Sequence, residues 1–191
     1  AQCTYFAEEC KIGIMPGTPR CTYGPVITCE NVQNSTISGG SRMAQQQELF
    51  DQVKAWSEAD FDDETRAEAT HLLARATAGD PDATATLEDA FACRLEFGTA
   101  GLRGEVGAGP RRMNRVVVTQ TAAGFAAYLH DRAARGETST PPSIVIGYDG
   151  RTHSAQFARD AAELMAGAGL RVTLMPEAGP TPLPPFGVSH L

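Results

Sequence analysis

Glycines and an arginine come together in one stretch of this sequence in a way that suits the binding of an anion. Residues 95–115, "LEFGTAGLRGEVGAGPRRMNR", contain five glycines, and Arg103 stands between Leu102 and Gly104. Glycine permits positive φ and lets backbone N–H groups come close to an anion, and a guanidinium matches the geometry of a phosphate. The stretch therefore predicts a phosphate-binding loop around Arg103.

A second arginine comes soon after an apolar run. In "SIVIGYDGR" the carboxylate of Asp149 can accept hydrogen bonds from nearby backbone N–H groups, and Arg151 follows the turn that results. A guanidinium at the end of a strand can hold phosphate through paired hydrogen bonds. Neither stretch is a Walker loop, because Gly-Lys-Ser/Thr is missing, or a GxGxxG dinucleotide loop. Taken alone, each stretch is also compatible with an ordinary turn.

Three short packing helices are predicted before the glycine-rich stretch, within residues 43–94. Asp62 or Asp63 caps the second helix, Gly79 ends it, and Asp80-Pro81 opens the third. The apolar positions expected to pack recur at helical spacing and are Leu49, Phe50, Val53, Trp56, Leu72, Leu73, Leu87 and Phe91.

Residues 95–191 show the alternation that is typical of an α/β domain. We expect a helix over 115–136, a strand at "SIVIGYDG", a helix over 154–169 capped by Ser154, a strand at "LRVTLMP", and the start of a helix in 181–191. The apolar character of both strands predicts a parallel sheet buried on both faces, with ligands at the carboxyl ends of the strands. Inward positions are expected at Val117, Thr121, Phe125 and Leu129, and at Phe157, Ala161, Leu164 and Ala168.

Charge and hydropathy restrict the partners. The net charge of −7 argues against a nucleic-acid partner, because binding phosphate backbones requires a basic face. No apolar run approaches the ~20 residues that a membrane span needs. The acidic run Asp60, Asp62, Asp63 and Glu64 is interpreted as a solvated helix start rather than a metal site. His71 has no second ligand nearby and is interpreted as a surface or packing residue.

Four cysteines, Cys3, Cys10, Cys21 and Cys29, lie in the first 29 residues. Zinc sites place ligands two to four residues apart, and these spacings are wider. We therefore predict a disulfide-rich mini-domain in residues 1–30, formed in an oxidising compartment, with three possible connectivities. Residues 31–42 contain Ser-Gly-Gly-Ser and are predicted to be a flexible linker to Met43.

The loop "CTYGPVITC" faintly resembles the reactive loop of Bowman–Birk-type protease inhibitors, with Tyr23 at the primary specificity position. Gly24 stands where that family has serine, and the paired prolines are missing. A structural loop, or a loop that binds another protein partner, remains the alternative to inhibition.

Several motifs of the later segment occur together in one order: "FGTAGLRG", "RMN", "VIGYDGR", "FARDAAELMAGAGLRV" and "PTPL". In this order and spacing they resemble the first domain of the α-D-phosphohexomutases, nearest to the actinobacterial phosphomannomutase/phosphoglucomutase branch. The resemblance covers roughly residues 45–191. It implies a truncated three-layer α/β/α domain over residues 95–191, after a helical region over 43–94.

The resemblance also implies an activity and a site. Members of the family move phosphate between the 1- and 6-positions of a hexose through a phosphoserine. By resemblance, Arg103, Thr99 and Gly101 belong to the loop that faces the phosphoserine or the sugar phosphate, and Arg151 lies near the same anion. Mg²⁺ is bound in that family by aspartates of a second domain, so no metal is expected on this chain.

One departure from the family decides what residues 1–191 are expected to do. The Thr-Ala-Ser-His-Asn loop of the family is not found in them, and Ser189-His190 has other neighbours. We expect an inactive fragment with an unpaired sheet edge. Two hypotheses follow: a cytoplasmic phosphohexomutase fragment in residues 43–191, or a secreted binding or inhibitory mini-protein in residues 1–30 joined to an adventitious mutase fragment.

Overall fold

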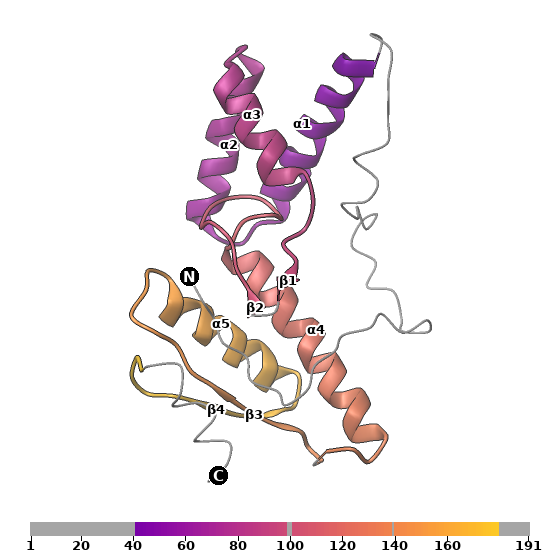
Figure 1. The fold of residues 1–191 in the computed structure, drawn as a ribbon, viewed down its shortest axis with the longest axis vertical. Coiled ribbons are helices and arrows are strands. Elements are labelled where there is room, and N and C mark those ends of the chain that lie inside the picture. The colour runs from indigo at the N-terminus through magenta and orange to yellow at the C-terminus, as the bar shows by residue number, and fades with distance from the viewer. Residues whose placement is uncertain (1–40, 99–100, 139, 180–191) are drawn as a thin grey trace.

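The computed structural model describes residues 41–98, 101–138 and 140–179. Three helices come first: α1 (Ser41–Ala59), α2 (Asp63–Thr77) and α3 (Pro81–Phe91). A small hairpin of β1 (Phe97–Gly98) and β2 (Gly101–Leu102) follows, and then α4 (Arg115–Ala134), β3 (Ser143–Ile146), α5 (Ser154–Gly167) and β4 (Arg171–Leu174). Figure 1 shows α1, α2 and α3 packed together beyond the beginning of α4, whereas β3 and β4 lie beneath α5.

The three-helix unit, α1 to α3, forms as predicted because its helices have local start signals and a shared apolar core. The Asp62 side chain accepts a hydrogen bond from Glu64 N (3.4 Å) where α2 begins. The rings of Trp56 and Phe91 meet edge to face with centroids 5.9 Å apart. The buried core residues are Val53, Ala69, Ala76, Ala83, Leu87, Ala90, Phe91 and Ala108. α1 begins at Ser41, inside the segment predicted to be a linker.

Asp80 caps α3 and pairs with α2 at the same time. One carboxylate oxygen accepts hydrogen bonds from Asp82 N (3.0 Å) and Ala83 N (3.3 Å), and the other accepts two from the Arg75 guanidinium (2.9 and 2.7 Å). The hydrogen bond from Arg75 is the main cause of a lowered pKa for Asp80, and that from Ala83 N adds to it.

This lowered pKa predicts how the stability of the three-helix unit depends on pH. The charged carboxylate stabilises the fold above its ordinary pKa of 3.8, and this contribution is lost as the pH falls through the lower folded pKa. Asp80→Asn keeps the cap acceptor and removes the charge. We expect thermal unfolding to show a lower midpoint for Asp80→Asn at pH 7 and a smaller difference from the wild type at pH 3. An equal difference at both pH values would contradict the assignment.

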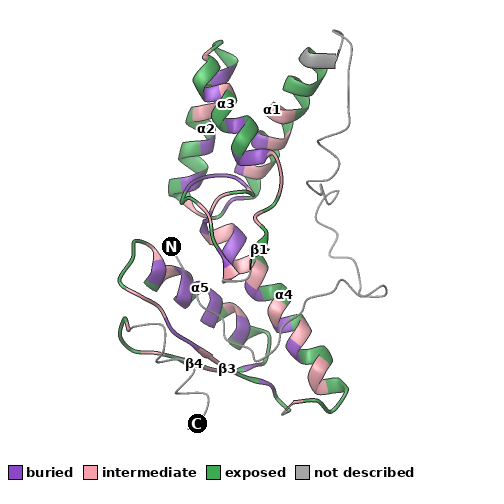
Figure 2. Cartoon of the chain, viewed as in Figure 1, coloured by how far each residue is buried: buried purple, intermediate pink, exposed green. Residues whose placement is uncertain are grey.

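The strand–helix–strand order predicted for the later segment is confirmed. β3 pairs with β4 in parallel, with Ile144 opposite Val172 and Ile146 opposite Leu174, and α5 connects the two strands. Both α4 and α5 pack on one face of this sheet. The shared core consists of Ala122, Ala126, Leu129, Ile144, Ile146, Ala158, Ala161, Ala162, Met165 and Leu170. Figure 2 shows buried residues along α5 and exposed residues on the outer surfaces of the helices.

The predicted burial of both strands is only partly right. Ile144 and Ile146 of β3 are buried, but Arg171, Thr173 and Leu174 of β4 are exposed. Among the described residues, no helix covers the second face of the sheet, so that β4 lacks the double cover that its apolar sequence suggested.

The inward faces of the two later helices also need correction. Val117, Leu129, Phe157 and Ala161 are buried as predicted. Thr121, Phe125 and Leu164 are only half-buried, and Ala168 is exposed. Their expected places in the core are taken by Ala122, Ala126, Ala158, Ala162 and Met165. Alanines let two helices approach closely, so the interface between α4 and α5 includes the small residues of each helix. No helix among the described residues is long and apolar enough to cross a bilayer.

Candidate functional site

Arg103 lies on a backbone that is fixed on both sides. Leu102 is buried in a small apolar group, the junction cluster, whose members are Leu102, Met113, Val117, Val118 and Phe157. On the other side, Glu105 O accepts a hydrogen bond from Met113 N (2.7 Å). The Arg103 side chain itself is exposed, and no hydrogen bond or ion pair joins it to another described residue. The donors of the Arg103 guanidinium are therefore open, while the residues on either side of it are packed or hydrogen-bonded.

The hairpin that carries Arg103 was not predicted, because the stretch was read as a loop. β1 and β2 pair with Phe97 opposite Leu102 and Gly98 opposite Gly101. Gly101 has a φ of +87°, a value that L side chains rarely adopt, and space is open around its Cα. Gly101 therefore serves the turn before Arg103, as its type suggested.

Two other glycines have a role that differs from the prediction. Gly107 N donates to Met113 O (3.3 Å), and Ala108 N donates to the Glu68 carboxylate of α2 (2.9 Å), so these N–H groups are not available to an anion. A Cβ on Gly109 would lie 2.8 Å from Ala90 O of α3. This part of the glycine-rich stretch packs the loop against the three-helix unit rather than cradling phosphate.

Asn114 holds the same loop from the other side. It is buried, and its Nδ2 donates to Gly107 O (2.9 Å) and Gly109 O (2.8 Å). Its Oδ1 accepts from Val117 N (2.9 Å) and caps α4. Carbonyl oxygens face the Nδ2 of Asn114 and a backbone N–H faces its Oδ1. All of these hydrogen bonds are therefore satisfied by a single orientation of the side-chain amide.

The Arg151 turn is ordered as the sequence predicts, but Ser154 does not cap α5. Asp149 Oδ1 accepts from Arg151 N (3.1 Å), and Asp149 Oδ2 lies 3.4 Å from Arg151 Nε. The Ser154 hydroxyl instead accepts from Asp149 N (3.3 Å), because α5 begins at Ser154 and the cap position falls on His153. The two terminal nitrogens of the exposed Arg151 guanidinium stay open to solvent within the described residues.

His153 links the Arg151 turn to the core, a contact that sequence reasoning missed. It has a φ of +63°, the one positive value among the described non-glycine residues, and its ring stacks on Phe157 with centroids 5.9 Å apart. A left-handed histidine leaves no mark in a sequence pattern. Phe157 belongs to the junction cluster together with Leu102, so the Arg103 hairpin and the Arg151 turn rest on one apolar cluster.

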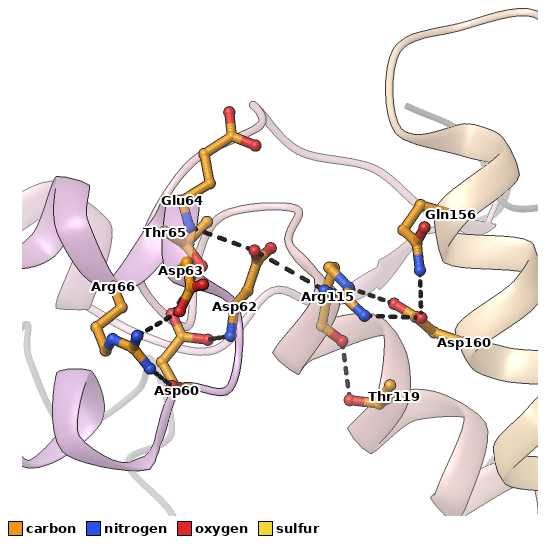
Figure 3. Close-up of polar contacts among 10 residues, drawn as sticks. All are labelled: Asp60, Asp62, Asp63, Glu64, Thr65, Arg66, Arg115, Thr119, Gln156 and Asp160. Carbon is orange, nitrogen blue, oxygen red and sulfur yellow. Dashed lines mark hydrogen bonds and ion pairs between the residues drawn. The ribbon is translucent and has the colours of Figure 1, made fainter.

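The acidic run is not uniformly solvated, as Figure 3 shows. Asp60 is buried and accepts from Thr65 Oγ1 (2.6 Å) and Asp62 N (2.9 Å), while Asp63 and Glu64 are exposed. These carboxylates are used for caps and ion pairs, and no metal-binding group of three side chains occurs in the described ranges. His71 is exposed, as expected.

Several predicted site residues lie outside the described residues. They are Thr99 of the phosphate loop, the four cysteines Cys3, Cys10, Cys21 and Cys29, and Tyr23. The helix predicted in 181–191 lies outside as well. Cys93 is described as a half-buried free thiol.

The two arginine loops and the β3–α5–β4 unit all fall in residues 94–191, which match the family model "Phosphoglucomutase/phosphomannomutase, alpha/beta/alpha domain I". The chain belongs to the phosphoglucomutase/phosphomannomutase family. This membership confirms the resemblance found in the motifs, and it places Arg103, Arg151 and Asn114 inside domain I of the family.

Relatives in the phosphoglucomutase/phosphomannomutase family include proteins named for different sugars. The human phosphopentomutase is 34% identical over 158 residues, which are 80% of this chain and 24% of the relative. A probable phosphomannomutase of Haemophilus influenzae is 49% identical over 80 residues (41% of this chain, 15% of the relative). A phosphoglucomutase of Staphylococcus haemolyticus is 38% identical over 112 residues (59% and 19%). The chain thus spans about a quarter or less of the length of these relatives. No solved structure matches it.

Proposed function

We propose that this chain contributes the first domain of a phosphosugar mutase, in which Arg103 and Arg151 bind the phosphoryl group. The observation that carries the proposal is the shared junction cluster, on which both arginine loops rest. Each loop has a hydrogen-bonded backbone, whereas the Arg103 side chain has open donors. The backbone of each loop is held in place, while the Arg103 guanidinium remains available to an anion. Such preorganisation favours tight binding.

The proposed reaction moves a phosphoryl group between the 1- and 6-positions of a hexose. A phosphoserine gives its phosphoryl group to the sugar, the bisphosphate turns around, and its other phosphoryl group returns to the serine. The two guanidinium groups would neutralise the phosphoryl oxygens as the P–O bonds break and form. Mg²⁺, in the family, would add charge neutralisation; the described residues of this chain offer it no group of ligands.

Residues 1–191 do not include a Thr-Ala-Ser-His-Asn sequence, so the proposal for a polypeptide of these residues is binding without turnover. The arginines recognise the phosphate rather than the sugar. We therefore expect similar affinities for inorganic phosphate, glucose 1-phosphate and ribose 5-phosphate, and no binding of glucose.

The test is a calorimetric or NMR titration of residues 1–191 with these ligands. Arg103→Ala and Arg151→Ala should each weaken phosphate binding by about 10- to 100-fold, because each removes charge-assisted hydrogen bonds. Arg159→Ala is the matched control, since Arg159 is an exposed arginine on α5 outside both loops. The proposal is wrong if the wild type binds no phosphate, or if all three variants bind it equally well.

A further inference from the structure

Arg115, the first residue of α4, contacts two separate parts of the fold, which are α5 and the connection between α1 and α2. Its Nε and one terminal nitrogen bind both carboxylate oxygens of Asp160 on α5, at 2.6 and 3.0 Å. Its other terminal nitrogen lies 3.9 Å from Asp62 Oδ1, at the start of α2, and the guanidinium carbon lies 5.0 Å from the centre of the Phe61 ring. Figure 3 shows the contacts of Arg115 with Asp62 and Asp160 bridging the three-helix unit and α5.

The Asp160 carboxylate needs partners within the protein, because its side chain is only 7% exposed to water. Gln156 Nε2, in the first turn of α5, also donates to it (2.7 Å). Loss of the guanidinium would leave this buried carboxylate without its cationic partner, which is strongly unfavourable. The hydrogen bond that Arg115 donates to Asp160 is the main cause of a raised pKa for Arg115.

The rest of the α4–α5 contact is mainly apolar. Its core includes small side chains, Ala122 and Ala126 on α4 and Ala158, Ala161 and Ala162 on α5, beside larger ones such as Leu129 and Met165. Apolar contacts are not directional, so such a face tolerates sliding and rotation more readily than a bidentate ion pair does.

Besides the Arg115 pair, one other side-chain hydrogen bond joins these helices among the described residues. His130 Nε2 lies 2.7 Å from Ala168 O, beyond the last turn of α5. The Arg115 pair, in contrast, lies on the half of α5 that begins directly after the Arg151 turn.

We propose that Arg115 is a positioning residue for the phosphate site. By holding Asp160 it sets the place of the Arg151 turn relative to Arg103, and through Asp62 it ties that geometry to the three-helix unit. The inference rests on the proposed function, because it presumes that Arg103 and Arg151 act on one anion.

The experiment measures phosphate affinity of residues 1–191 in Arg115→Lys, which keeps the charge but loses the two-pronged contact with Asp160. We expect affinity to fall about tenfold, with a folded protein at the temperature of measurement. His130→Phe is the control: it removes the link at the far end of α5 and should leave affinity within about twofold of the wild type.

A second arm separates positioning from a merely structural role. If Arg115 acts by placing Arg151, then Arg115→Lys should cause no further loss of affinity in an Arg151→Ala background. Equal losses in both backgrounds, or wild-type affinity in Arg115→Lys, would overturn the proposal while leaving the phosphate site intact. If Arg115→Lys does not fold, Asp160→Asn gives the same comparison. Failure of the wild type to bind phosphate would instead refute the proposed function, and the positioning role with it.

Discussion

Phe157→Ala should lower the free energy of unfolding by about 3–5 kcal/mol, a large share of the stability of a single domain. Phe157 is 2% exposed and belongs to the junction cluster. Its loss leaves a cavity under Leu102 and removes the ring on which His153 stacks. Urea unfolding followed by circular dichroism measures the change.

Phe157→Ala should also weaken phosphate binding at the proposed site by more than the loss of stability alone would cause. Leu87→Ala, in the core of the three-helix unit, is the control, because Leu87 is fully buried but belongs to another core cluster, which contains neither Leu102 nor Phe157. At a temperature where both variants are folded, we expect Phe157→Ala to bind phosphate at least about fivefold more weakly than Leu87→Ala. Equal affinities would show that the cluster does not support the arginine loops.

Asn114→Ala should be nearly as damaging, with a loss of about 3 kcal/mol. The change removes the helix cap at Val117 N and leaves Gly107 O and Gly109 O without their buried donor. Thermal unfolding of the variant and the wild type measures the loss.

Asn114→Ser separates the two roles of this residue. A serine hydroxyl can still cap α4, which is worth about 1 kcal/mol, but it does not reach both loop carbonyls. We expect Asn114→Ser to recover about that amount and no more. Full recovery of stability would show that the cap on α4, rather than the hydrogen bonds to the glycine-rich loop, accounts for the contribution of Asn114 to stability.

The elements of the fold were largely readable from the sequence because their signals are local. Caps such as Asp62 and Asp80, and the alternation of apolar strand and helix, act within a few residues, and the helices and the parallel pair of strands follow them. Ser154 shows the limit of such signals. A serine before a helix suits a cap, but here its hydroxyl bonds the preceding turn.

The parts of the site that were missed depend on contacts between distant residues. The glycines at 107 and 109 suggested a phosphate-binding loop. In the structure, Glu68 of α2 accepts a hydrogen bond from the backbone of this loop, and Ala90 of α3 packs against it. The burial of Asp60 and the role of Arg115 likewise depend on the packing of three segments. Periodicity carries no information about such contacts, so only the motifs taken together indicated the family.

The core of the three-helix unit has a consequence for biosynthesis. Apart from Ala108, its buried residues fall between Val53 and Phe91, so they are contiguous in the chain. Local contacts form quickly, and domains mature from the amino end as the ribosome extends them. We expect this unit to fold on the nascent polypeptide before the arginine loops, which then pack against it.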